Sequence, residues 1–301
     1  YYLLVIPYII SGGDPYGAII MEIILWAIGG WFLLKLIESS SRFLVIPIGL
    51  AWVSSNYIVL TNLYSFNPNP VTLLTPLFIY GLLEYLKGRK YWILLVWFLG
   101  GAFFNFEMNF GVFTPLILLA CILIVDKKLF RDRFFWYGFL IFILTLLPQV
   151  LFDLKHQFIM SKSIIRFLSE SNAQEFNILR RLPVIWESYF NVLSATLMNQ
   201  KFLSWSFILL VIPTMEILFK GRKNITALVT TVLIIIPYIG YVIVPVTVNA
   251  WHLGAFATSS LLLIVFPLVF FWRKSFLGKI VCGVLATSLI LYSISNITNF
   301  F

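Results

Sequence analysis

The chain has 301 residues, of which 61% are hydrophobic and 11% are charged, and its mean hydropathy is +0.97. A soluble fold of this length cannot bury so much apolar surface, so the composition excludes a soluble globular protein and indicates a polytopic membrane protein. The net charge of +9 does not imply a nucleic-acid partner, because most basic residues lie in short clusters between apolar runs, as topological anchors do.

The first segment of the chain is too short to cross a bilayer. Residues 1–10 are apolar and end in the turn sequence SGGDP, so we expect a helix that lies in the membrane interface. The chain starts at Tyr1 without an initiator methionine or signal sequence, and we expect it to be truncated at its N-terminus.

Beyond this turn, the chain is organised as ten apolar runs. Most are close to the ~20 residues that a helix needs to cross about 30 Å of hydrocarbon. The runs cover residues 16–37, 43–60, 70–86, 91–107, 110–125, 134–152, 203–219, 225–245, 253–272 and 278–297. They lack the alternation of a membrane barrel. The sequence therefore predicts an all-α fold, a polytopic helical bundle of about ten transmembrane helices plus the interfacial helix, and we treat residues 1–301 as a single transmembrane domain.

Basic residues indicate which ends of the spans face the cytoplasm. Of the 21 Lys and Arg residues, all but six fall in alternate connections between the spans. They are Lys35, Arg42, Lys87, Arg89, Lys90, Lys127, Lys128, Arg131, Arg133, Lys220, Arg222, Lys223, Arg273, Lys274 and Lys279. The positive-inside bias places these connections in the cytoplasm, so both ends of the chain are expected outside.

Residues 153–201 form the one sizeable polar excursion of the chain, and we expect an extracytoplasmic loop there. Its six cations, on the side where cations are scarce, are Lys155, Lys162, Arg166, Arg180, Arg181 and Lys201. Two interpretations stay open: the segment is a solvated, partly helical loop, or its cations have an anionic partner. Apolar residues at helical spacing also predict an amphipathic helix on the outer membrane surface. They are Leu182, Ile185, Trp186, Tyr189, Leu193 and Leu197.

Polar residues also mark the outer ends of other spans. Asn67 and Asn69 flank Pro68 before the third span, where they act either as turn formers and a helix cap or as sugar-binding amides. Glu107 ends the fourth span, and Glu22 lies about a third of the way through the first. An acid at the bilayer centre costs about 2.5–3.5 kcal/mol, so each indicates a cavity or a partner. For Glu22, a hydrogen bond to a neighbouring helix explains the residue as well as a functional role does.

The sequence lacks the motifs of several enzyme classes. It has no GxxxxGK[ST], HExxH or GxSxG pattern, and its two histidines, His156 and His252, are far apart in the chain. ATP-driven transport, zinc proteolysis and serine hydrolysis are therefore poorly supported. His252 lies at the outer edge of the ninth span, a position typical of an interfacial anchor. Cys121 and Cys282 lie in apolar runs without CxxC spacing, so we expect them to be core residues.

Four sequence motifs occur in an order that carries a family resemblance. They are YYLLVIPYIISGGDPYG, FNPNP at the start of a span, NFEMNFG at the end of the next, and LPQVLFDLKHQF before the polar segment. In order and spacing, they resemble bacterial and archaeal relatives of the protein mannosyltransferases, in the C-type glycosyltransferase superfamily that includes the lipid A aminoarabinose transferase. The resemblance covers roughly residues 1–170, and the last four spans match only in character.

The resemblance implies an integral-membrane glycosyltransferase of a bacterial or archaeal plasma membrane. Such an enzyme moves a hexose or pentose from a polyprenyl-phosphate donor to a lipid, glycan or protein acceptor on the extracytoplasmic face of the bilayer. In these families a catalytic aspartate lies in the loop before a juxtamembrane helix of the YYLL type. We therefore expect the general base to precede Tyr1 and this fragment to be catalytically incomplete. No organic cofactor is expected, and a divalent cation is left open.

Together, the resemblance and the chemistry indicate candidate site residues. The candidates for catalysis are Asp153 and Glu107, and those for substrate binding are Lys155, His156, Arg166, Asn67 and Asn69. Cations would hold the donor phosphate and stabilise it as it leaves, while carboxylates and amides would orient the sugar or take a proton. The chain departs from the family at two places. Many relatives carry an arginine where this chain reads GAIIME, at residues 17–22, and some carry a histidine near the position of Glu107.

Two other classes of protein remain as alternatives. A membrane transporter or lipid flippase also places charged residues in membrane cavities, and often shows an internal repeat. Six expected spans precede the polar segment and four follow it, with unlike spacing, and the charged groups gather at one face rather than at the midplane. These features favour an interfacial enzyme. A structural or assembly subunit would not need the outward basic segment.

Overall fold

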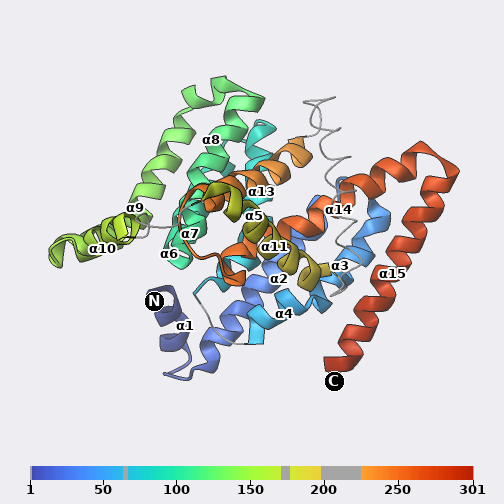
Figure 1. The fold of residues 1–301 in the computed structure, drawn as a ribbon, viewed down its shortest axis with the longest axis horizontal. Helices are drawn as coiled ribbons and strands as arrows, with labels where there is room; N and C mark the ends of the chain where they lie inside the picture. Colours follow the sequence, from blue (N-terminus) through green and yellow to red (C-terminus); the bar gives the residue numbers. More distant parts are fainter. Residues whose placement is uncertain (1, 64–66, 171–176, 198–224, 301) are drawn as a thin grey trace.

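A computed structural model describes residues 2–63, 67–170, 177–197 and 225–300, and in these ranges every regular element is helical (Figure 1). The elements in chain order are α1 Tyr2–Ile10, α2 Tyr16–Glu38, η1 Arg42–Leu44, α3 Val45–Ser54, α4 Asn56–Leu63, α5 Asn69–Leu86, α6 Trp92–Phe106, α7 Met108–Gly111, α8 Phe113–Val125, η2 Lys127–Arg131, α9 Arg133–Lys155, α10 Ile159–Glu170, α11 Ile178–Leu197, α13 Ile225–Ile243, η3 Ala250–Leu253, α14 Gly254–Lys274 and α15 Phe276–Phe300. The all-α fold is thus confirmed for the described part of the chain.

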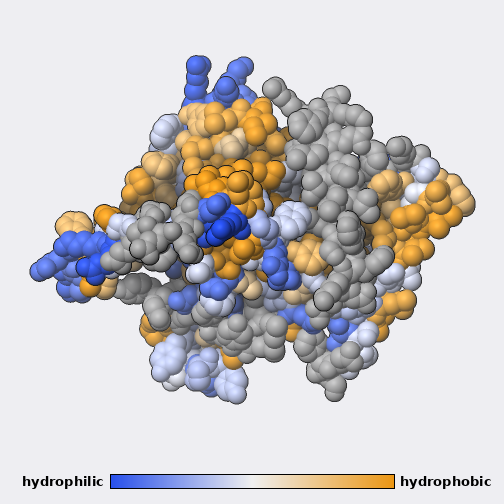
Figure 2. Space-filling model, in the orientation of Figure 1, coloured by the Kyte–Doolittle hydropathy of each residue, from blue (hydrophilic) through white to orange (hydrophobic). Residues whose placement is uncertain are grey.

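Six helical segments among these residues are long and apolar enough to cross a membrane. They cover Tyr16–Glu38, Met108–Val125, Arg133–Lys155, Ile225–Ile243, Ala250–Arg273 and Phe276–Thr298. Apolar side chains cover the surface over α8–α9 and α15, with a hydrophilic tip where α8 meets α9 (Figure 2). The protein is therefore a multi-pass membrane protein, whose peripheral helices present apolar side chains to lipid.

The predicted count of about ten spans is not confirmed. α6 has 15 residues, which is about 22 Å of helix at 1.5 Å per residue and short of a full bilayer core. The run at residues 70–86 forms α5, which is not among the six spans. The run at residues 43–60 is broken in two, and the predicted span at residues 203–219 lies outside the described residues, as does Lys201.

The break within residues 43–60 lies at Ser55. α3 ends there because the backbone becomes extended, with φ −61° and ψ 120°. The Ser55 hydroxyl then accepts a hydrogen bond of 3.3 Å from the N–H of Ile58, as a serine does when it caps the start of a helix. The polar stretch here is only residues 54–56, and the apolar residues beyond it on both sides make the segment look like one continuous span in a hydropathy analysis.

α5 is the central helix of the bundle, and of its 18 residues only Leu77 and Tyr80 are partly exposed. It packs against α2, α6, α13 and α14. Gly29 of α2 lies directly against the Leu73 carbonyl of α5, where any Cβ would collide with backbone. Close backbone approach of this kind is how membrane helices gain packing energy, because lipid gives apolar side chains no reason to associate.

Small and polar residues join α9 to α6. A Cβ on Gly101 would overlap the Thr145 hydroxyl, and one on Gly138 would overlap the Trp97 ring. The Asn105 amide donates to the carbonyls of Gly101 (2.8 Å) and Thr145 (3.0 Å). α9 is therefore fixed to the bundle along one side, while most of its other surface is exposed and apolar.

The predicted amphipathic helix in the polar segment is α11. Its apolar face is occupied by protein, because Ile185, Tyr189 and Leu193 are buried where α11 packs against α13 and α14. Leu182 and Trp186 of the same face are exposed, and the position of α11 on the outer membrane surface stays a prediction. The Arg181 guanidinium adds hydrogen bonds to three carbonyls at the end of α13 and just beyond it. They belong to Tyr241 (2.8 Å), Val244 (2.9 Å) and Val246 (2.7 Å).

Candidate functional site

The first part of the candidate site is a carboxylate–amide pair between α2 and α5. Glu22 is fully buried on α2, and Asn69, the first residue of α5, is buried against it. The Asn69 Nδ2 donates a hydrogen bond of 2.9 Å to Glu22 Oε2. A buried acid needs such donors in an apolar surrounding. The predicted sugar-binding amide is thus engaged with Glu22, while Asn67 lies half-buried just before α5.

The second part is built around Glu107, which separates α6 from α7. Its backbone is extended, with φ −145° and ψ 92°, so α6 ends and the carboxylate turns back to cap α7. Oε1 accepts a hydrogen bond of 3.1 Å from the N–H of Asn109. Glu107 is 8% exposed. Burial raises the pKa of this carboxyl, and hydrogen bonds from Asn109 partly oppose the rise.

The Asn109 side chain connects this carboxylate to His252, which is also buried. The amide nitrogen Nδ2 lies 3.0 Å from His252 Nε2, and His252 Nδ1 accepts a hydrogen bond of 3.2 Å from the N–H of Asn249. The contact therefore joins two buried polar side chains, and the tautomer of the imidazole decides which of them donates the hydrogen bond.

Neighbouring elements close this end of the bundle around η3. The Tyr241 hydroxyl of α13 donates to the His252 carbonyl (3.1 Å), and the Tyr57 hydroxyl of α4 donates to the Ala250 carbonyl (2.6 Å). Arg181 holds α11 on the same end through its three carbonyl contacts, and loss of solvation there lowers the pKa of its guanidinium. A phosphate at Arg181 would have to compete with these contacts.

Asp153 stands in the last turn of α9 and fixes the start of α10. Its carboxylate accepts hydrogen bonds from the Met160 N–H (2.7 Å), the Ser161 N–H (3.3 Å) and the Ser161 hydroxyl. These donors belong to the first turn of α10, where N–H groups lack helical partners and favour a negative charge. The candidate catalytic Asp153 is therefore the N-terminal cap of α10.

The connection between α9 and α10 forms a basic pocket. The pocket has a volume of about 450 Å³ and is lined by His156, Lys162, Ser163 and Arg166, among others. The His156 ring stacks on Phe152, with ring centroids 4.0 Å apart, and its Nδ1 lies 2.7 Å from the Phe152 carbonyl. The structure thus brings His156 and Arg166 together, while Lys155 is exposed at the end of α9 and does not line the pocket.

The candidate residues fall into three groups rather than one: Asn69 with Glu22, Glu107 with Asn109 and His252, and the residues at the α9–α10 connection. α10 extends away from the bundle at the end of α9 (Figure 1), and no hydrogen bond or ion pair of the described residues joins Asp153 or His156 to Glu107. Sequence reasoning did not assign a site role to Lys162 or to Asn109. The i, i+4 spacing of Lys162 and Arg166 places both on one helix face and could have identified Lys162. Nothing along the chain pairs Asn109 with His252.

No group of three or more His, Cys, Asp or Glu side chains converges on a possible metal position in the part of the chain that the structure describes. Comparisons with protein-family models, with curated proteins and with solved structures give no match for this chain. The chemistry of the three groups therefore has to be argued from their own geometry.

Proposed function

We propose that this protein is an integral-membrane glycosyltransferase of a bacterial or archaeal plasma membrane. It moves a sugar from a polyprenyl-phosphate donor to a lipid, glycan or protein acceptor on the extracytoplasmic face. The family resemblance of residues 1–170 motivates this proposal. The observation that carries it is the basic pocket at the α9–α10 connection, which joins cations to an apolar surround.

The composition of this pocket fits the head of a lipid-linked sugar phosphate. Lys162 and Arg166 supply two positive charges within one pocket, and cations hold a phosphate through charge-assisted hydrogen bonds. Exposed apolar side chains lie at the same turn, at Phe158 and Ile159, and further along α10, at Ile165. They suit a polyprenyl chain that enters from the bilayer. A soluble anion without an apolar chain would make no favourable contact with these apolar side chains.

The group around Glu107 contributes to the acid–base chemistry that such a transfer needs. In the proposed step, the acceptor hydroxyl loses its proton to a carboxylate as its oxygen bonds to the anomeric carbon. The bond from that carbon to the phosphate oxygen breaks, and polyprenyl phosphate leaves. Glu107 can assist this proton transfer, because burial raises the pKa of its carboxyl above the ordinary value. Asn109 and His252 hold its surroundings in place.

The test uses the natural full-length protein in proteoliposomes, with labelled polyprenyl-phosphate mannose, glucose or aminoarabinose as donor. Arg166→Gln and Lys162→Gln should each raise the donor KM about tenfold with little change in kcat, because each loses a charge-assisted contact made in both ground and transition states. Lys128→Gln, an exposed lysine in η2, is the matched control. Absence of transfer from every donor would refute the proposal. Variants that behave like the control would remove the pocket from donor binding.

A second candidate, a transporter or lipid flippase, is favoured by one observation. Glu22 is fully buried inside the apolar helix α2, and intramembrane carboxylates often mark ion pathways. The same proteoliposomes separate the two functions. A transporter would move donor lipid or protons across the bilayer without cleaving the sugar–phosphate bond, and Glu22→Gln would abolish that flux.

A further inference from the structure

A second pocket lies where α2, η1 and the end of α5 meet, among the residues that the positive-inside bias places at the cytoplasm. It has a volume of about 440 Å³, and its lining includes Lys35, Glu38, Arg42, Glu84 and Lys87. It shares no lining residue with the α9–α10 pocket. Nothing in the proposed glycosyl transfer uses it.

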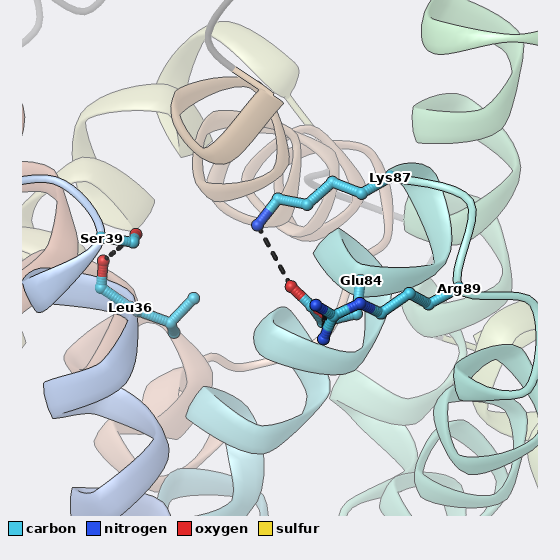
Figure 3. A network of polar contacts seen from close by, with 5 residues as sticks. All are labelled: Leu36, Ser39, Glu84, Lys87 and Arg89. Carbon is cyan, nitrogen blue, oxygen red and sulfur yellow. Dashed lines mark hydrogen bonds and ion pairs between the residues drawn. The ribbon is translucent and has the colours of Figure 1, made fainter.

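Glu84 forms one wall of this pocket, and two cations already neutralise it. Its side chain is 6% exposed, and Lys87 Nζ lies 3.2 Å from its Oε1. The Arg89 guanidinium contacts the other oxygen. Figure 3 shows both basic side chains reaching Glu84 from the turn after α5, with Ser39 and Leu36 of the α2 end on the facing side. The negative charge of Glu84 is therefore balanced by Lys87 and Arg89. It does not offset the positive charges of Lys35 and Arg42.

The remaining charges leave a positive surplus. Arg42 pairs with Glu38 at 3.5 Å, but the two side chains are 87% and 56% exposed, so this ion pair is weak and Arg42 can exchange partners. The Lys35 ammonium lies 5.1 Å from the centroid of the Trp31 ring. Four cations thus face two carboxylates around the pocket. The C-terminal ends of α2 and α5 offset only part of this surplus, with about half a negative charge each.

Exposed aromatic side chains near the pocket residues in the chain fit a position at the level of lipid headgroups. Trp31 precedes the pocket residue Lys35 by four positions, and Tyr91 follows Lys87 by four. Their side chains are 60% and 72% exposed, and such amphipathic rings gather at the membrane–water interface. A basic pocket at that depth faces the phosphates of one leaflet. Basic pockets between helices on the cytoplasmic side take anionic headgroups by this chemistry.

We propose that this second pocket binds a phosphate group, held by Lys35 and Arg42, with Lys87 and Arg89 as the fixed positive background. The phosphate can belong to the headgroup of an anionic phospholipid or to a small soluble phosphate. The contact chemistry is the same in both cases: charge-assisted hydrogen bonds from ammonium and guanidinium groups to phosphate oxygens.

The test measures the melting temperature and the retained lipid of the full-length protein in nanodiscs. Phosphatidylglycerol added to phosphatidylcholine nanodiscs should raise the melting temperature and stay bound in native mass spectrometry. The double variant Lys35→Gln/Arg42→Gln should weaken that binding at least about tenfold, because it removes two charge-assisted contacts. Lys127→Gln/Lys128→Gln removes the same charge from η2, whose lysines do not line the pocket, and should retain the wild-type response.

The arms of this experiment separate the sources of phosphate. A rise caused by inorganic phosphate, but not by chloride at equal ionic strength, in pure phosphatidylcholine nanodiscs would assign the pocket to a soluble phosphate. Equal loss in the two double variants would show a general surface-charge effect and overturn the proposal. Absence of any response in the wild type would overturn it as well. Both pairs of residues are exposed, so unchanged melting in phosphatidylcholine alone verifies that each variant folds.

Discussion

The Thr258 hydroxyl of α14 donates a hydrogen bond of 2.7 Å to the Thr72 carbonyl of α5. This carbonyl needs an outside donor because the residue four positions later is Pro76, which has no N–H. Thr258 and Thr72 are both buried, at 0% and 2% exposure. In an apolar bundle an unpaired carbonyl is costly, so the proline in the central helix selects the position at which α14 packs.

We expect Thr258→Val, which keeps the side-chain shape, to lower the free energy of unfolding by about 1 kcal/mol, with a corresponding fall in melting temperature in detergent. Ser259→Ala is the matched control, because the buried Ser259 hydroxyl bonds the Ala255 carbonyl within its own helix. That carbonyl keeps its backbone donor. Pro76→Ala should restore an N–H to Thr72 and rescue Thr258→Val. Equal losses in the variant and the control would refute this account.

The sequence predicts the helices that are single long apolar runs with polar residues at both ends. It does not predict features that depend on contacts between helices. α2, α9 and α13 follow their predicted runs closely, since a long apolar run with polar ends has few other solutions in a membrane. Hydropathy does not reveal the break at Ser55, because the polar stretch of residues 54–56 is short and apolar residues lie beyond it on both sides. The apolar face of α11 was predicted, but whether protein or lipid covers it depends on where α13 and α14 lie.

The candidate site shows the same division. Glu22 was recognised as anomalous from its depth alone, and a bond to a neighbouring helix was one of its two interpretations. Its partner Asn69 is interpreted from the sequence as a turn former and helix cap or as a sugar-binding amide, because no local pattern links residues on two different helices. Asp153 was identified from its place at the end of an apolar run, but its capping of α10 depends on the turn at Gln157 and Phe158. Both have positive φ, a conformation that hydropathy does not reveal.

The Glu22–Asn69 pair gives a second prediction. Asn69→Leu should lower the free energy of unfolding by about 1–3 kcal/mol, because the buried Glu22 carboxyl loses a donor. Glu22→Leu in the same background should recover part of that loss, since two apolar side chains can replace a polar pair. A double-mutant cycle in detergent measures the coupling. Asn67→Leu, at the half-buried neighbour, is the control and should show no coupling to Glu22→Leu.

The third prediction concerns the pH dependence of stability at Glu107. Burial raises the pKa of its carboxyl above the ordinary 4.5, so the folded state holds this proton more tightly than the unfolded state. The contribution of Glu107 to stability is therefore greatest below pH 4.5 and declines as the pH rises through its folded pKa. Glu107→Gln removes this titration. The melting temperature of the variant, minus that of the wild type, should rise with pH above 4.5 and then level off.

Asn109→Ala extends this prediction, because the Asn109 side chain opposes the rise in the pKa of Glu107. Without it, the folded pKa should move further up, and the decline should continue to a higher pH than in the wild type. In the Glu107→Gln background, Asn109→Ala should no longer alter the pH dependence in this range. A melting-temperature difference between Glu107→Gln and wild type that stays constant above pH 4.5 would show that the folded protein does not perturb this carboxyl.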